Sequence, residues 1–232
     1  MDAALNRSDN GVLLQFCRWA ILLTFVLNLG MLFFSQFDPF DYMHYQWICT
    51  TVWALLYIPS FIGLAILNKD KLIRICFAAI AAGAILGLCA DYSLFLQIGL
   101  AGFDPFVNLL QTLLLLAAVI TICLHSDIRV KYPRLSTAFI FFIGVRCIIF
   151  FYYKYIIAHR LFIFIEPKDF FPYLNFRYNV AYSIIAFAFW FVALKKPFPV
   201  AETFDSKALS SPAILCPCAV ALIASIVLTI LS

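Results

Sequence analysis

Long apolar segments separated by short polar turns follow one another along almost the whole chain. Each is close to the roughly 20 residues that a helix needs to cross a hydrocarbon core about 30 Å thick. The pattern predicts seven spans, near 12–35, 41–67, 72–100, 105–124, 136–158, 172–194 and 212–231. No polar segment is long enough to fold as a soluble domain. Residues 1–232 are therefore expected to form one all-α, polytopic membrane domain.

Two of the turns carry the same tetrapeptide, Phe37-Asp38-Pro39-Phe40 and Phe103-Asp104-Pro105-Phe106. In each, the aspartate can cap a helix, and proline suits the first helical position because it has no N–H to satisfy. Pro172 is expected to open the sixth helix in a similar way. The repeat indicates either an internal duplication or one interfacial turn that arose twice.

Composition agrees with the membrane interpretation. Hydrophobic residues make up 65% of the chain and charged residues 12%, against about 25% charged in soluble domains. The net charge of +4 comes from basic residues at the ends of the apolar segments, where positive-inside bias places them. This distribution argues against a nucleic-acid partner and for membrane lipids.

The basic residues also predict the orientation. Eleven fall on one side of the predicted membrane: Arg7, Arg18, Lys69, Lys71, Arg74, Arg129, Lys131, Arg134, Lys195, Lys196 and Lys207. At most four fall on the other: Lys154, Arg160, Lys168 and Arg177. The N-terminus is therefore expected to be cytoplasmic, and seven spans would place the C-terminus in the lumen or outside.

The third predicted helix carries a face of small residues. Ala79, Gly83 and Gly87 recur every four residues and are followed at the same interval by Asp91. Small residues at this spacing let another helix approach closely, because lipid provides no hydrophobic drive for helix association. Ala79, Gly83 and Gly87 are therefore predicted to be a helix-packing face.

A second group of polar residues is predicted to lie inside the membrane. Arg146 is near the middle of the fifth helix and, like Asp91, should face protein or water, because exposure to lipid costs at least about 2.5–3.5 kcal/mol. By depth, Asp91 matches Lys154, and Arg146 matches Asn28 of the first helix, so an Asp91–Lys154 pair is favoured over Asp91–Arg146. The group forms either a polar pathway or headgroup site, or a set of interhelical contacts and snorkelling side chains. The residues that would extend it are Asn108, Gln111, Asn175, Arg177 and Asn179.

Pro59 falls inside the second predicted helix. It removes a backbone hydrogen bond and should kink the helix there. Neighbouring helices and Ser60 are the candidates for satisfying the freed carbonyl. The alternative interpretation is a hinge for gating.

No pattern of a catalytic, metal or cofactor site appears. The eight cysteines lie mostly in apolar segments, where free cysteine behaves as a small hydrophobic residue. Cys216-Pro217-Cys218 has no second pair to complete a metal site. His44 and His159 are the candidate bases if the protein is a lipid-modifying enzyme.

Residues 12–125 carry short motifs of a known family. Tyr45-Gln46-Trp47, Pro59-Ser60, Gly63-Leu64 and Asn68 resemble the jagunal family of endoplasmic reticulum membrane proteins. The gap between Trp47 and Pro59 is about two residues longer than in the family, and family members have about four spans. The resemblance implies a place in the early secretory pathway and no catalytic activity.

Three classes of function remain. The first is a non-catalytic accessory subunit or scaffold that binds other transmembrane helices in a hetero-complex. The second is a transporter or channel for a lipid or small solute, using Asp91, Arg146 and Lys154. The third is a membrane-embedded enzyme. The near-absence of soluble loops favours the first class, since such a protein has little but its helices to present.

Overall fold

The described part of the chain is helical apart from short turns. The computed structural model describes residues 2–37, 39–95, 104–126, 128–151 and 167–194. The helices are α1 (Asp2–Phe37), α2 (Pro39–Leu67), α3 (Lys71–Phe95), α4 (Asp104–His125), α5 (Ile128–Lys131), α6 (Pro133–Phe151) and α7 (Pro167–Ala193). No strand occurs in these ranges, in agreement with the all-α prediction.

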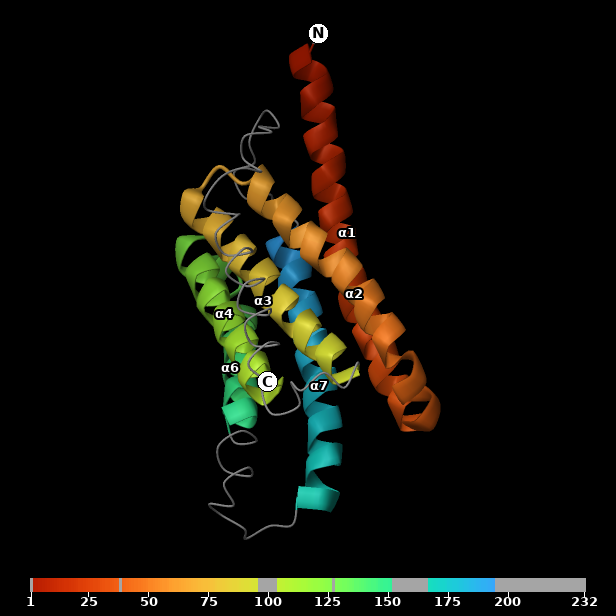
Figure 1. Ribbon diagram of the computed structural model, residues 1–232. Coiled ribbons are helices and arrows are strands. Elements are labelled where there is room, and N and C mark those ends of the chain that lie inside the picture. The colour runs from red at the N-terminus through yellow and green to blue at the C-terminus, as the bar shows by residue number, and fades with distance from the viewer. Residues whose placement is uncertain (1, 38, 96–103, 127, 152–166, 195–232) are drawn as a thin grey trace.

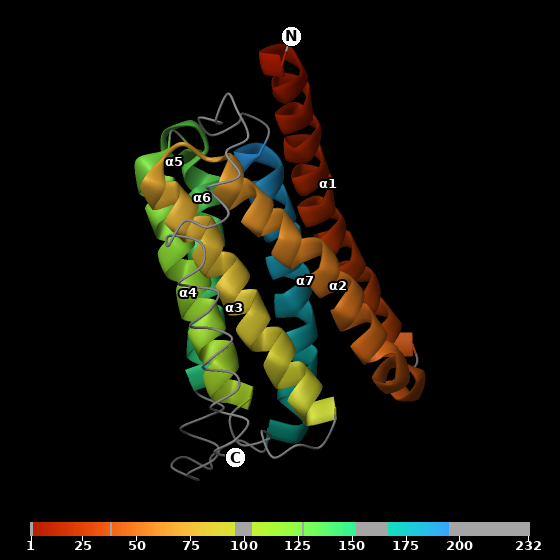
Figure 2. The same ribbon diagram turned by 45° about the horizontal axis from the view of Figure 1, so that its top comes forward.

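The six long helices form a closed ring in chain order (Figure 1). Each packs against the next, and α7 packs back on α1. Successive long helices run in opposite directions, and the short α5 joins α4 to α6 at one end (Figure 2). Antiparallel neighbours are the expected result of short connections between helices.

Four helices are long and apolar enough to cross a membrane. These stretches are Gly11–Phe34, Ile48–Leu67, Lys71–Leu88 and Phe176–Ala193. Leu109–His125 in α4 is a shorter apolar helix. A membrane-type helical bundle therefore has direct support within the described residues, whereas the seventh predicted span, 212–231, lies outside them.

Three helix boundaries differ from the prediction. Helix α1 begins at Asp2 rather than near residue 12, because the residues between Asp2 and Gly11 include no helix breaker. Helix α5 was not predicted, since four residues are too few for a periodic pattern. Helix α7 begins at Pro167 rather than Pro172, because Pro167 already offers the preferred first helical residue.

Trp190 of α7 fills the middle of the ring. Its side chain is fully buried. The ring centroids of Phe61 in α2, Phe77 in α3 and Phe139 in α6 lie 5.1, 6.4 and 6.4 Å from its own. Buried aromatic pairs at these distances contribute about 0.5–1.5 kcal/mol beyond their area. One side chain therefore holds four helices together.

Helices α1 and α2 approach closely at a glycine. A Cβ atom added at Gly63 would lie 2.6 Å from Sγ of Cys17, which is closer than real Cβ atoms come. Cys17 is itself buried, so it has little room to withdraw. Gly63 thus sets the spacing of this helix pair.

The turn between α2 and α3 is held by three polar side chains. The carboxylate of Asp70 accepts from the backbone N–H groups of Leu72 (2.8 Å) and Ile73 (3.4 Å), which caps α3. The backbone N–H of Asp70 donates to the Asn68 side chain (2.9 Å). Arg74 donates from Nη2 to the backbone carbonyl of Asn68 (2.9 Å), so a basic side chain closes the end of α2.

Basic residues collect at this end of the bundle. The α2–α3 turn and the α4–α6 connection lie at the same end (Figure 2). Together they carry Lys69, Lys71, Arg74, Arg129, Lys131 and Arg134. The two connections predicted to share one membrane side from their basic residues are thus neighbours in the fold.

Replacing Trp190 with alanine is expected to lower the free energy of unfolding by about 3–5 kcal/mol, because it leaves a cavity where four helices meet. The matched control is Trp19→Ala on α1, where the side chain is 59% exposed. Thermal unfolding in detergent should show a large fall in Tm for the first variant and little change for the second. Equal effects would contradict the central role of Trp190.

Candidate functional site: a polar cluster inside the bundle

Arg146 of α6 lies among tyrosines contributed by its neighbours. Its guanidinium carbon is 5.2 Å from the ring centroid of Tyr182 in α7. It is also within electrostatic range of Tyr57 in α2 and Tyr178 in α7. A guanidinium stays charged in proteins, and a cation over an aromatic face gains about 0.5–2 kcal/mol. The Tyr182 ring therefore offsets part of the cost of placing this charge among apolar helices.

Asn28 of α1 contacts the residue of α7 that directly follows Tyr182. Its side-chain amide donates to the hydroxyl of Ser183, 2.7 Å away. Ser183 is fully buried. Asn28 and Arg146 thus contact consecutive residues of α7, Ser183 and Tyr182, and the cluster joins α1, α6 and α7 at one level.

Tyr178 fixes the other side of the cluster. Its hydroxyl donates to the backbone carbonyl of Phe142, which links α7 to α6. The rings of Tyr178 and Phe142 also stack, with centroids 5.7 Å apart. Tyr178 and Tyr182 are one helical turn apart, so they present their rings on the same face of α7. The arrangement can hold a cation within the bundle and join helices.

The predicted packing face of α3 lies against α4 of the same chain. A Cβ atom at Gly83 would be 3.5 Å from the Gln111 backbone carbonyl oxygen, and one at Gly87 would collide with the Gln111 side-chain amide. Ala79, one turn earlier, is half-buried. The helix that approaches Gly83 and Gly87 is therefore an internal neighbour, and this face is not open to a partner.

The predicted pairing of Asp91 lies outside the described side chains. The structure gives the helix at Asp91 but not its side chain, and Lys154 falls in the undescribed range 152–166. Of the residues predicted to extend the set, Arg177 is exposed and Asn179 half-buried. The side chains of Asn108 and Asn175 are also outside the description.

Pro59 sits within α2, which remains helical through it. Proline has no N–H for the carbonyl of Leu55, four residues earlier. The hydroxyl of Ser60 bonds the carbonyl of Leu56 (2.6 Å) rather than that of Leu55. The prediction that Ser60 satisfies the freed carbonyl is therefore wrong. The carbonyl that its hydroxyl reaches belongs to Leu56, four residues before Ser60, whereas the freed carbonyl belongs to Leu55. Such back-bonding itself bends helices.

No group of three or more His, Cys, Asp or Glu side chains that could hold a metal ion occurs among the residues that the structure describes. Cys17, Cys49, Cys76, Cys123 and Cys147 are free thiols. The side chains of His44 and His159, and the Cys216–Cys218 pair, lie outside the described part.

The tyrosines were missed by the sequence analysis. Tyrosine in membrane helices is typical of the interface, so Tyr57, Tyr178 and Tyr182 drew no attention. The sequence feature that could have identified them is the i, i+4 spacing of Tyr178 and Tyr182, with Ser183 directly after, within an otherwise apolar segment. Polar atoms at that spacing mark one face that points toward protein.

Comparisons of this chain with protein-family models, curated proteins and solved structures found no match. The resemblance to the jagunal family therefore stays a prediction, and the functional argument depends on the geometry of the helices.

The contact between Asn28 and Ser183 can be measured by a double-mutant cycle. Interhelical hydrogen bonds in membranes are worth about 0.6 kcal/mol on average and up to about 1.7. The variants Asn28→Ala and Ser183→Ala should therefore show a coupling energy in this range when unfolding is followed in detergent or bicelles.

Thr24 supplies the control for this cycle. It lies one turn before Asn28, but its hydroxyl bonds the carbonyl of Ile21 in its own helix (2.6 Å). Thr24→Ala and Ser183→Ala should be additive. A coupling no larger for Asn28 than for Thr24 would show that the hydrogen bond does not join α1 to α7.

Proposed function

We propose that the protein is a non-catalytic, multi-pass accessory subunit or scaffold of a membrane complex. The observation that carries the proposal is the outer face of α1, defined by six exposed residues: Val12, Phe16, Trp19, Leu23, Val26 and Gly30. They lie along most of the candidate span Gly11–Phe34, and Phe33 beyond them packs edge-on against Phe176 of α7. Helix α1 packs mainly against α2 and α7, so this face points away from the bundle.

The spacing on this face suits a second helix. Its residues alternate at intervals of four and three, the pattern with which two helices interlock their side chains. Gly30 lies within it, and none of the described residues comes within 4 Å of a Cβ built there. Small residues permit close helix approach in a membrane, where packing drives association. A partner transmembrane helix is the occupant that these features favour.

The polar cluster supports an architectural role over transport. Asn28, Arg146 and Tyr178 all make contacts to neighbouring helices of the same chain. Groups used in this way stabilise the bundle and position α1 against α7. The transport alternative requires Asp91 and Lys154 as well, and these two side chains lie outside the described part of the chain.

The proposal includes topology and location. The chain crosses the membrane seven times, with the N-terminus and the basic end of the bundle in the cytoplasm, following the positive-inside rule. The resemblance of Tyr45-Gln46-Trp47 and Pro59-Ser60 to the jagunal family supports the endoplasmic reticulum and early secretory pathway. Its partners would be membrane lipids and other transmembrane helices.

A photo-crosslinking amino acid at Leu23, on the outer face of α1, is expected to capture one defined membrane protein in native membranes. The same amino acid at Ile148, which is 68% exposed on α6, should not capture it. Mass spectrometry would identify the product, and the same protein should co-purify with the unmodified chain in mild detergent. Crosslinks to lipid alone from both positions would contradict a partner on this face.

A steric variant tests the same contact without a crosslinker. Gly30→Leu fills the place where the partner helix is expected to approach, and should reduce co-purification of that protein at least several-fold. Gly11→Leu is the control, because Gly11 is also exposed with nothing within 4 Å but lies off the outer face of α1. Equal recovery of the partner with both variants would overturn the assignment of the face.

A further inference from the structure

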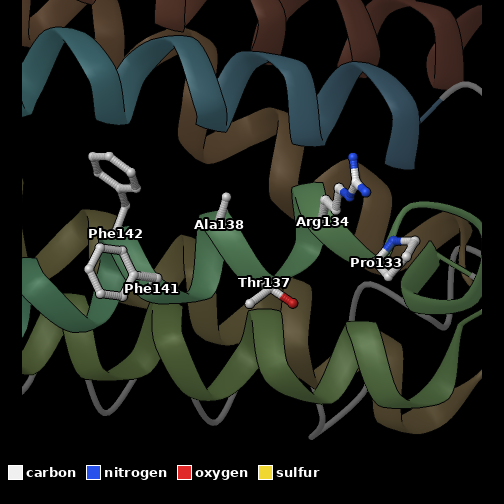
Figure 3. A pocket seen from close by; sticks show the side chains of 6 residues that line it. All are labelled: Pro133, Arg134, Thr137, Ala138, Phe141 and Phe142. Carbon is white, nitrogen blue, oxygen red and sulfur yellow. The ribbon is translucent and has the colours of Figure 1, made fainter.

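An open apolar groove of about 510 Å³ runs along the first half of α6. The described residues that line it all come from this helix: Pro133, Arg134, Thr137, Ala138, Phe141 and Phe142. Figure 3 shows Arg134 toward one end and the rings of Phe141 and Phe142 at the other. From Arg134 to Phe142 the helix rises about 12 Å. This is close to one leaflet, since half of the hydrocarbon core is about 15 Å.

The end of the groove at Arg134 has the chemistry of a membrane interface. Arg129, Lys131 and Arg134 are all exposed there, and Asp127 is the one acidic residue in the sequence from Ser126 to Ile149. Tyr132 between them is also exposed, and tyrosine prefers the headgroup level. The cations therefore lie where lipid phosphates lie, while Phe141, 63% exposed, lies deeper.

The start of α6 adds to the positive potential at this end. The first N–H groups of a helix lack intrahelical acceptors, and the helix dipole favours an anion near them. The backbone N–H of Ser136 donates to the carbonyl of Tyr132, which is the first hydrogen bond of α6. The N–H groups of Arg134 and Leu135 come before this bond. An anion beside Arg134 would meet both a guanidinium and the helix N-terminus.

We propose that this groove binds an anionic phospholipid of the cytoplasmic leaflet. The phosphate lies against Arg134, with Arg129 and Lys131 around it, and one acyl chain follows Thr137 and Ala138 toward Phe141. The positive charge of the basic side chains selects an anionic headgroup, and the apolar side chains of the groove contact the acyl chain. A peptide occupant is disfavoured because the groove offers an apolar wall with few polar groups for a backbone. The inference is independent of whether α1 binds a partner protein.

Native mass spectrometry of the full chain in detergent tests the proposal. Phosphatidylserine and phosphatidylcholine with identical acyl chains are the two probes. The wild-type chain should retain phosphatidylserine preferentially. Arg134→Gln should weaken that retention about fivefold, the effect of one cation near an anionic lipid. Lys71→Gln removes an exposed cation from the same end without touching the groove, and should change retention less than twofold.

A second variant tests the apolar half. Thr137→Trp fills the groove with a ring and should reduce retention of both lipids, while leaving the exposed cations in place. Equal retention of the two lipids by the wild-type chain would overturn the proposal. Equal losses of phosphatidylserine retention in Arg134→Gln and Lys71→Gln would also overturn it. So would unchanged lipid retention in Thr137→Trp, or a second copy of the protein bound in place of lipid.

Discussion

Lipid offers no hydrogen-bond partner, and this constraint explains how polar groups are used in the bundle. Asn28 bonds Ser183, and Tyr178 bonds the carbonyl of Phe142, so each joins two helices. Thr24 turns back onto its own helix instead. Arg146 lies over the ring of Tyr182. The polar side chains therefore join particular helix faces, and the aromatic rings around Trp190 pack α7 against α2, α3 and α6.

The same constraint shapes the interpretation of function. Gly83 and Gly87 are used to bring α4 close, and Gly63 brings α2 against α1. At Gly30, by contrast, no atom of the described residues comes within 4 Å of a Cβ built there. The small residues inside the bundle let its own helices pack closely, whereas Gly30 on the outside of α1 leaves room for a helix of another protein. The proposal of a subunit or scaffold rests on this difference.

The sequence predicted the fold better than the site. Helix positions followed from apolar length, and the turn at Asn68–Asp70 from its polar residues, because both signals are local. The contacts of Arg146 were not predictable, since they depend on which helices are neighbours in the ring. Depth counting placed Arg146 near Asn28 but could not reveal Tyr182 and Ser183 between them. The faces of α3 and α1 were likewise indistinguishable until their neighbours were known.

The central claim is a membrane-spanning bundle whose basic end faces the cytoplasm. A membrane-impermeant maleimide applied to sealed microsomes tests it, with labelling read by mass spectrometry of the modified peptide. Lys71→Cys at the basic end should be labelled directly, and Arg177→Cys near the start of the candidate span Phe176–Ala193 only after the membrane is permeabilised; both positions are exposed. The reverse order of labelling, or labelling of both before permeabilisation, would contradict the account.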